Sequence, residues 1–330
     1  MYNDKYMEEN MKHYLVTSSQ FIPYINLAYE DYQLHHLKED ECLFYLWQNH
    51  HTVVIGKNQN AFKECKVEEL TESGGYLARR SSGGGAVYHD HGNLNFTFIA
   101  PKTFYDLEKN LQVIIDALKH FGINASFSGR NDIEVEGFKV SGNAFANTNT
   151  HSLHHGTLLF DVKMEDLGKY LNVSSVKLAS KGVESVRKRV KNLKEFNPTL
   201  TLESLSSSLI QAYESVFDTK LETIEMDTTA CGDLIDYYSS TSFRLEPIPT
   251  FEASLHKKFS FGELILFITT HQNMIQSVQV FTDSLIVDLK DTIEALFLNQ
   301  PFRKDVLLLR CIDQPHEEVL IDIINELFMS

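Results

Sequence analysis

The sequence predicts an α+β protein with a large first domain, residues 1–246, a short linker, residues 247–250, and a small second domain, residues 251–330. Helical stripes and short strands alternate in the first domain without a regular βαβ repeat. Pro247 and Pro249 interrupt any regular element and indicate a stiff connection. The remaining chain, about 80 residues, contains its own hairpin and helical stripes and is long enough to fold alone or dock on the larger part.

The first domain begins with a predicted helix and strands. Residues Ile25 to Leu37 place apolar side chains at three- and four-residue spacing, which predicts a helix. The runs Cys42–Trp47 and Thr52–Ile55 are rich in aromatic and β-branched residues, as buried strands are. Between Leu94 and Phe98, apolar and polar residues alternate, which predicts a strand with two different faces.

A second helix and further strands complete the expected elements. Leu111 to Phe121 carries a clear helical stripe, and Gly122 is its expected C-cap. Short strands are predicted at Asp132–Gly137, Phe138–Gly142 and Gly156–Val162. In the second domain we expect a hairpin of Phe261–Thr270 and Ile275–Asp283, with helices near Ile286–Leu298 and Val319–Phe328 over its apolar face.

Composition excludes several classes of protein. The net charge of −15 argues against general nucleic-acid binding, which needs an excess of Lys and Arg. No run of about 18 apolar residues occurs, and the polar first residues lack the apolar core of a signal peptide, so we expect no membrane span and a cytoplasmic location. The four cysteines lie far apart without a C-x-x-C pair, which favours reduced, buried thiols over disulfides or a zinc site.

The segment RRSSGGGAVYHD, which begins at Arg79, has the features of an anion site. Three consecutive glycines, Gly83 to Gly85, allow unusual backbone dihedrals and a close approach of a ligand to backbone N–H groups. Arg79 and Arg80 add fixed positive charge. The spacing matches neither a P-loop nor a dinucleotide fingerprint. From this segment alone, a plain glycine-rich turn between two strands remains the alternative.

Lys139, in FKVSG, is a second candidate for binding an anion. It alternates with Phe138 and Val140, so its side chain points to the sheet face opposite theirs. Taken alone, it is a solvated strand lysine. Ser141 and Gly142 are expected to form a small turn beside it, so that Lys139, Arg80 and the glycine segment converge on one anion.

Two other features have plain interpretations that we favour. His89 and His91, and likewise His154 and His155, invite a zinc interpretation, but no Cys or carboxylate pattern completes such a site. The segment Lys177 to Phe196 is basic within an acidic protein. It is typical of a solvated helix face, and the alternative is a docking patch or a loop that binds a nucleotide phosphate.

Together these motifs resemble the lipoate–protein ligase A family, whose fold is shared with biotin protein ligases. The resemblance is strongest in RRSSGGGAV and KVSGNAF, which are highly specific in combination. It also covers INLAYED, LFYLWQNHHTVVIGKNQN, SGRNDI, HHGTLLF and KLASKGVESVRKRVKNL. The second domain is similar to the small accessory domain of that family. The resemblance therefore implies a mixed or antiparallel-sheet catalytic domain followed by an accessory domain.

The resemblance implies a two-step reaction that uses ATP, Mg²⁺ and lipoate. The lipoate carboxylate attacks the α-phosphorus to give lipoyl-AMP and pyrophosphate, and a lysine of an acceptor then takes the acyl group. The implied acceptors are lipoyl domains of 2-oxoacid dehydrogenase E2 subunits and the H protein of glycine cleavage. Lys139 would be the catalytic residue, between the carboxylate and the α-phosphate. Lys177 to Val183 would close over the adenylate.

The same likeness implies the binding residues. For ATP and the adenylate they are Arg80, Gly85, Ala86, Val87, Tyr88, Lys139, Lys181 and Gly182. For lipoate they are Lys139, Gly84, His155 and Gly156, with His155 and Gly156 at the mouth of an apolar slot. Asp132 is the candidate ligand for the Mg²⁺ that accompanies ATP.

Three alternatives share parts of this pattern. A lipoyl or octanoyl amidotransferase on the same fold uses a cysteine thioester, but residues 128–160 contain no cysteine. A non-catalytic protein that binds lipoate or lipoyl domains would not need both Arg80 and Lys139. A biotin ligase is disfavoured because KVSGNAF and HHGTLLF are more similar to lipoate enzymes.

Overall fold

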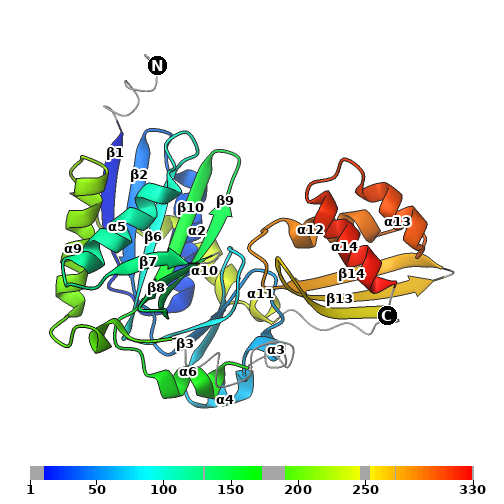
Figure 1. The fold of residues 1–330 in the computed structure, drawn as a ribbon, viewed down its shortest axis with the longest axis horizontal. Helices are drawn as coiled ribbons and strands as arrows, with labels where there is room; N and C mark the ends of the chain where they lie inside the picture. The colour runs from blue at the N-terminus through cyan, green and yellow to red at the C-terminus, as the bar shows by residue number, and fades with distance from the viewer. Residues whose placement is uncertain (1–10, 129–130, 173–189, 246–252, 272, 329–330) are drawn as a thin grey trace.

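A computed structural model of the chain describes residues 11–128, 131–172, 190–245, 253–271 and 273–328. Figure 1 shows a large body built from the first part of the chain and a smaller body built from the C-terminal part. The predicted linker, residues 247–250, lies outside the described residues. Among the residues described, no helix combines the length and the hydropathy needed to cross a membrane.

An eight-stranded sheet forms the centre of the large body, in the order β11-β1-β2-β6-β10-β9-β8-β7. Its strands are β1 (Lys12–Thr17), β2 (Glu41–Trp47), β6 (Asn93–Pro101), β7 (Ala125–Ser128), β8 (Asp132–Val135), β9 (Phe138–Asn147), β10 (His151–Leu159) and β11 (Glu222–Thr223). β1 pairs in parallel with β2 and β11, and the other pairs are antiparallel. The sheet is therefore mixed.

Helices cover both faces of this sheet (Figure 1). Phe44 and Leu46 of β2 pack in one core with α5 (Leu107–Lys119) and α9 (Leu202–Val216). Leu43, Tyr45 and Trp47 face the other way, into a core with α2 (Pro23–His36) and α10 (Gly232–Ser239). Because side chains alternate along a strand, this arrangement explains why the run Cys42–Trp47 is apolar at every position.

A smaller sheet, in the order β4-β3-β5, lies beside the large one. Its strands are β3 (Thr52–Ile55), β4 (Tyr76–Arg79) and β5 (Val87–His89), and the glycine segment connects β4 to β5. Helices α3 (Ala61–Glu64), α4 (Val67–Glu72), α6 (Met164–Tyr170) and α11 (Thr241–Arg244) and the 3-10 turns Leu193–Glu195 and Thr229–Cys231 complete the large body.

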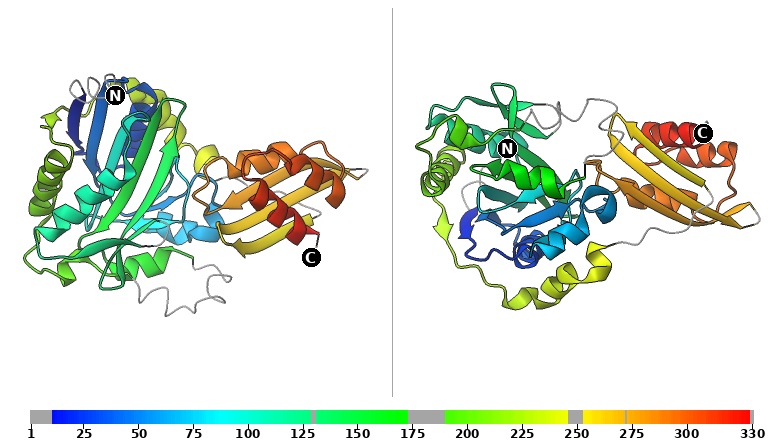
Figure 2. Two further views of the ribbon diagram at one scale, coloured as in Figure 1. Left: turned by 45° about the horizontal axis from the view of Figure 1, so that its top comes forward. Right: turned by 90° about the horizontal axis from the view of Figure 1, so that it is seen from below.

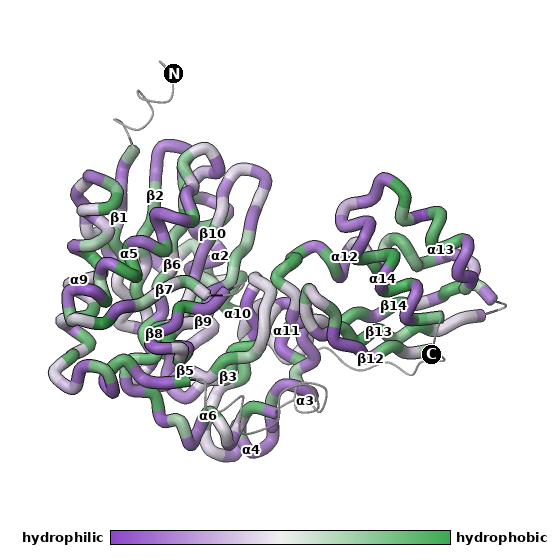
Figure 3. Tube along the Cα trace, viewed as in Figure 1, coloured by the Kyte–Doolittle hydropathy of each residue, from purple (hydrophilic) through white to green (hydrophobic). Residues whose placement is uncertain are grey.

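The C-terminal body is a three-stranded antiparallel sheet covered by helices. It comprises β12 (Ala253–Phe259), β13 (Gly262–His271), β14 (Met274–Thr282), α12 (Leu289–Phe297), α13 (Lys304–Cys311) and α14 (Glu317–Leu327). The helices and one face of the sheet share a core of their own, and Figure 3 shows apolar residues along β13, β14 and α12. A separate core is what allows this segment to be a folding unit.

The C-terminal body contacts one side of the large body (Figure 2). The backbone N–H of Thr282 donates to the carbonyl oxygen of Asn58 at 2.7 Å, and the N–H of Gly84 donates to the carbonyl of Ser284 at 3.1 Å. The ammonium of Lys63 lies 5.6 Å from the centre of the Phe267 ring. One amide of the glycine segment is thus bonded to the C-terminal body.

Most of the strongly patterned elements lie where the sequence predicts them, and three differences are informative. β1 and β12 were not expected, because their short, partly exposed strands lack a clear alternation. α13 was also not expected. Ser141 and Gly142 do not form a turn but lie inside β9, where β9 continues to Asn147 and the pairing with β8 contains an irregularity.

Candidate active site

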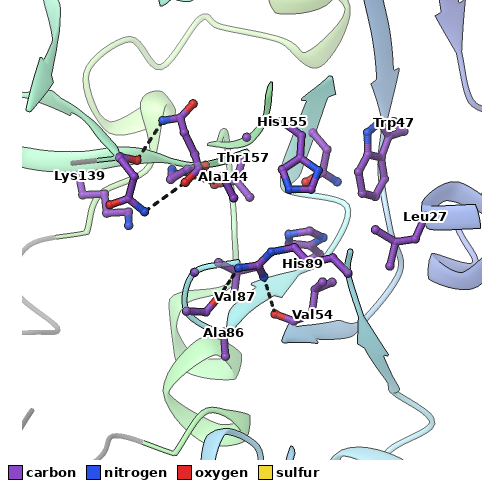
Figure 4. A pocket seen from close by; sticks show the side chains of 18 residues that line it. Leu27, Trp47, Val54, Ala86, Val87, His89, Lys139, Ala144, His155 and Thr157 are labelled. Atoms are coloured by element: carbon purple, nitrogen blue, oxygen red, sulfur yellow. Dashed lines mark hydrogen bonds between the residues drawn. The ribbon is translucent and has the colours of Figure 1, made fainter. Parts of the chain in front are cut away.

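A pocket lies between the large sheet and the glycine segment (Figure 4). Its floor is a row of residues from four neighbouring strands. Trp47 of β2 lies opposite Asn95 of β6, and Asn95 lies opposite Thr157 of β10. The hydroxyl of Thr157 accepts a hydrogen bond from the backbone N–H of Gly142, in β9, at 3.1 Å. The facing wall consists of Val54, Arg80, Gly84 to Val87, and His89, while Leu27 comes from α2.

Lys139 lies at one end of this pocket, at the start of β9. Its Nζ atom is 2.7 Å from Oδ1 of Asp132, and each of the two side chains is 32% exposed. A Cβ atom on Gly142 would lie only 3.1 Å from this Nζ, so a larger residue there would crowd the ammonium group. Val190 pairs with Lys139 on the other edge of the strand. The ammonium group is therefore fixed in position but still open to a ligand.

Arg80 holds the glycine segment in shape from within. Its Nη2 atom donates to the carbonyl oxygens of Gly83 at 2.6 Å and Gly85 at 2.8 Å, and its Nε donates to Oγ of Ser82 at 3.0 Å. The side chain is buried, and desolvation lowers its pKa to about 10, so it stays charged at neutral pH. Gly84 has φ of +90°, a conformation that favours glycine. The Arg80 guanidinium thus donates most of its hydrogen bonds to the glycine segment itself.

His155 links the pocket wall to a buried carboxylate. Its Nδ1 atom lies 2.9 Å from both carboxylate oxygens of Glu30, so it donates there. Its Nε2 atom is 2.6 Å from the hydroxyl of Ser82, which in turn accepts from Arg80. Thr97 also donates to Glu30, at 2.5 Å. His155 thus lies on a buried wall rather than at the mouth of the slot, and it supports the loop that Arg80 shapes.

The structure brings together most of the residues that the sequence predicts as a site, with exceptions. Gly84, Gly85, Ala86, Val87, Lys139, His155 and Gly156 line the pocket. Tyr88 does not, because its side chain turns away and its hydroxyl lies 2.8 Å from Nδ1 of His51. Asp132 reaches the site through its ion pair with Lys139. Lys181 and Gly182 lie outside the described residues.

Comparison with known proteins gives one consistent result. A family profile described as the lipoyl protein ligase A/B catalytic domain matches residues 22–214, and one described as the bacterial lipoate protein ligase C-terminus matches residues 248–329. The lipoate–protein ligase A of Psychrobacter cryohalolentis is 41% identical over 295 residues, which cover 86% of this chain and 87% of that protein. The chain belongs to the lipoate–protein ligase family.

Solved structures agree with this assignment. A P. falciparum protein in complex with lipoate is 28% identical, with a TM-score of 0.86 over 96% of this chain and 100% of its own. A bi-partite lipoate protein ligase from Thermoplasma acidophilum is 23% identical, with a TM-score of 0.64 over 73% of this chain and 98% of its own, and shows the same fold. The predicted family, fold class and ligase activity are confirmed.

The four cysteines of this ligase are free and buried, and none lines the pocket. Burial raises the pKa of Cys42 and Cys65 to about 12, and it also raises the pKa of Cys231 and Cys311. Buried thiols in the protonated form are poor nucleophiles. Within the described ranges, no group of three or more His, Cys, Asp or Glu residues is arranged to hold a metal ion.

Sequence reasoning missed several residues of the ligase pocket. Trp47, Asn95 and Thr157 line it, and Glu30 supports it, but none was singled out. A signal existed for Asn95, because it is one of the polar positions on the strand whose apolar positions face the core. Trp47 and Glu30 lie in predicted apolar segments and gave no comparable signal.

Proposed function

We propose that this ligase activates free lipoate with ATP to give lipoyl-AMP and then transfers the lipoyl group to a lysine of a lipoyl domain. The observation that carries the proposal is the position of Lys139 at the open end of a pocket whose other end is formed by Trp47 and Leu27 (Figure 4). A carboxylate at Lys139 places an acyl tail along the row of Thr157 and Asn95. Burial of each methylene stabilises the complex by about 0.8 kcal/mol.

In the first step, the positive charge of Lys139 reduces the repulsion between the lipoate carboxylate and the α-phosphate of ATP. A carboxylate oxygen attacks the α-phosphorus, and the bond from that phosphorus to the bridging oxygen of pyrophosphate breaks. The ammonium group stabilises the charge that develops between carboxylate and α-phosphate. In the second step, the amine of the acceptor lysine attacks the acyl carbonyl, AMP leaves, and the amine loses a proton. Asp132 keeps Lys139 oriented before substrates bind.

The backbone of the glycine segment is the proposed nucleotide site. Gly85 to Val87 line the pocket close to Arg80, and the N–H groups of a glycine-rich backbone suit phosphate oxygens. Arg80 contributes by holding Gly83 and Gly85 in place and by its positive charge. Lys181 and Gly182, which lie outside the described residues, are proposed to close over the adenylate.

Mg²⁺ is proposed to enter with ATP. Mg²⁺ in nucleotide sites is commonly held by one or two carboxylates together with the phosphates, and Asp132 is the one acidic side chain in contact with Lys139 among the described residues. A single carboxylate fits an ion that arrives with its own phosphate ligands. Bound Mg²⁺ would reduce the charge of the phosphates.

Residues 251–330 are proposed to act as an accessory domain that moves between the two steps. The carbonyl oxygen of Ser284 accepts a hydrogen bond from the backbone N–H of Gly84. A ligand that binds this N–H group must therefore break that hydrogen bond between the two bodies. The proposed acceptors are lipoyl domains of E2 subunits and the H protein of glycine cleavage. Free, buried cysteines fit the reducing cytoplasm.

The test is a two-stage assay with purified protein. Lipoate, MgATP and ligase are expected to form lipoyl-AMP, and added lipoyl domains are expected to gain a lipoyl group. A parallel reaction supplies octanoyl-carrier protein without ATP. Transfer in that reaction, with no acyl-AMP formed from free lipoate, would replace the proposal with an amidotransferase. Binding of lipoate without turnover in either reaction would support the non-catalytic alternative.

A further inference from the structure

Two buried polar groups of the pocket lack a hydrogen-bond partner among the residues that the structure describes. They are Nε2 of His89 and Nδ2 of Asn95, and both residues line the pocket. His89 is 3% exposed and Asn95 is 2% exposed, so bulk water does not satisfy them. Native proteins pair nearly all buried polar groups. Two unmet groups in one pocket therefore indicate that a ligand supplies the partners.

The hydrogen-bond network identifies Nε2 of His89 as a donor. Asn26 Nδ2 donates to the carbonyl oxygens of Gln20 at 3.0 Å and Gln48 at 2.9 Å, and to Oδ1 of Asn49 at 3.0 Å. This orients the amide of Asn49, whose Nδ2 faces Nδ1 of His89 at 3.2 Å. Nδ1 of His89 then accepts, and the hydrogen lies on Nε2. Burial lowers the pKa of His89 to about 3, so the ring is neutral at pH 7.

Asn95 contributes a second donor. Its Oδ1 accepts from Nδ2 of Asn93 at 3.0 Å, and its own NH₂ group has no partner among the described residues. Asn95 lies next to Trp47 in the sheet, and the Trp47 ring packs edge-on against His89 with a centroid distance of 6.2 Å. The two donors therefore share the end of the pocket that is formed by Trp47, while Lys139 lies at the opposite end (Figure 4).

The spacing between Lys139 and these donors suits an eight-carbon acid. Gly142 beside Lys139, Thr157 and Asn95 occupy three adjacent strands. Two strand spacings amount to about 10 Å, which is of the order of the length of such an acyl chain. An acid whose carboxylate contacts Lys139 thus brings the far end of its chain to His89 and Asn95.

Lipoate differs from octanoate at that far end, where it carries a dithiolane ring with two sulfur atoms. Sulfur lone pairs are weak hydrogen-bond acceptors, whereas a plain alkyl chain has none. We propose that His89 Nε2 and Asn95 Nδ2 donate to the dithiolane sulfurs and so determine the preference of this ligase for lipoate over alkyl acids of similar length. The inference rests on the proposed function, since it assumes that the pocket holds the lipoyl group.

The size of the expected preference follows from the cost of leaving the two N–H groups without a hydrogen-bond acceptor when an alkyl acid binds. A sulfur atom gives these buried N–H groups an acceptor that an alkyl chain cannot, and for one group an unmet buried donor corresponds to about five- to a hundredfold in affinity. Sulfur is a weaker acceptor than oxygen, which places the expectation toward the lower part of this range. We therefore expect roughly tenfold or more discrimination in favour of lipoate over an alkyl acid of similar length.

The experiment compares lipoate, octanoate and 5-cyclopentylpentanoate, which has a five-membered ring without sulfur. Dissociation constants by calorimetry and kcat/KM for pyrophosphate release are measured for each acid. We expect the wild-type ligase to favour lipoate over the cyclopentyl acid in both measurements. Equal values for these two acids would overturn the inference, and this comparison requires no variant. Failure to turn over any of the three acids would instead overturn the proposed ligase function.

Matched variants then assign the discrimination to the two donors. In His89→Asn, the amide oxygen can replace Nδ1 as the acceptor for Asn49, but the donor toward the pocket is lost. In His89→Gln, the longer amide can restore a donor at the position of Nε2. We expect His89→Asn and Asn95→Leu to reduce the ratio of lipoate to cyclopentyl acid about tenfold, and His89→Gln to retain more of it. An unchanged ratio in both His89→Asn and Asn95→Leu would contradict the assignment.

Discussion

Gly56 provides a way to move the glycine segment without replacing a residue that lines the pocket. A Cβ atom at Gly56 would lie 2.2 Å from the carbonyl oxygen of Gly84 and 3.3 Å from Nη2 of Arg80. Contacts of real Cβ atoms essentially never fall below 3.0 Å, so in Gly56→Ala this carbonyl must shift by most of an ångström. Gly84 lies between Gly83 and Gly85, whose carbonyl oxygens both accept hydrogen bonds from Arg80. A shift of Gly84 therefore moves the whole glycine segment.

A displacement of that size in the proposed nucleotide-binding loop is expected to lower the rate of adenylation by about a hundredfold. The crowding is expected to cost about 1–3 kcal/mol of stability. The assay is the initial rate of pyrophosphate release with lipoate and ATP, together with thermal unfolding.

Gly232→Ala is the matched control, because a Cβ atom there meets nothing within 4 Å at the start of α10. This variant should retain the wild-type rate. The reasoning would be refuted if Gly56→Ala released pyrophosphate as fast as Gly232→Ala.

Three further outcomes are expected. Burial lowers the pKa of His13 to about 4 and of His89 and His154 to about 3, from 6.5, so between pH 6.5 and about 4 only the unfolded chain takes up these protons. The free energy of unfolding should therefore be greatest above pH 6.5 and fall as the pH decreases, by at most about 1.4 kcal/mol per pH unit for each histidine; denaturant titrations that give equal stability at pH 7 and pH 5 would contradict this. Replacement of all four cysteines by serine or alanine should preserve transfer per folded molecule, and a single replacement that abolished transfer but not adenylation would favour the amidotransferase. A non-hydrolysable lipoyl-AMP analogue should change hydrogen exchange at the amides of Gly84 and Thr282, and unchanged exchange under saturation would argue against movement of the accessory domain.

The sequence predicts those parts of the fold in which local periodicity and tertiary burial agree. α5 has a single apolar stripe and a side-chain N-cap at Asp106, and β13 and β14 are consecutive strands that pair in antiparallel, so local patterns suffice. β1 pairs with β2 and, more than 200 residues along the chain, with β11, whereas β12 lies on the edge of its sheet and pairs only with β13 among the described strands. Their own sequences carry little of that information.

The candidate site shows the same division. The glycine segment and Lys139 stood out only in combination, because each alone has a plain interpretation, as a turn between strands and as a solvated strand lysine. The bonding of Arg80 to its own loop depends on how residues 80–85 fold back, which spacing does not reveal. Glu30 lies on α2, 125 residues before His155 in the chain, and only the tertiary structure brings them within 2.9 Å. His89 offered no sign of its unmet donor, because that depends on Asn26 and Asn49.

The most direct test of the central claim is the rate of lipoyl-AMP formation by Lys139→Ala. Removal of this ammonium group leaves two anions facing each other, and the loss of such a group typically costs on the order of 10² to 10³ in rate. Lys220→Ala is the control, because it also removes a lysine in an ion pair, with Glu214 at 2.6 Å, but on the exposed surface. The account predicts that the folded Lys139→Ala variant forms lipoyl-AMP at least a hundredfold more slowly than Lys220→Ala; equal rates for the two variants would contradict it.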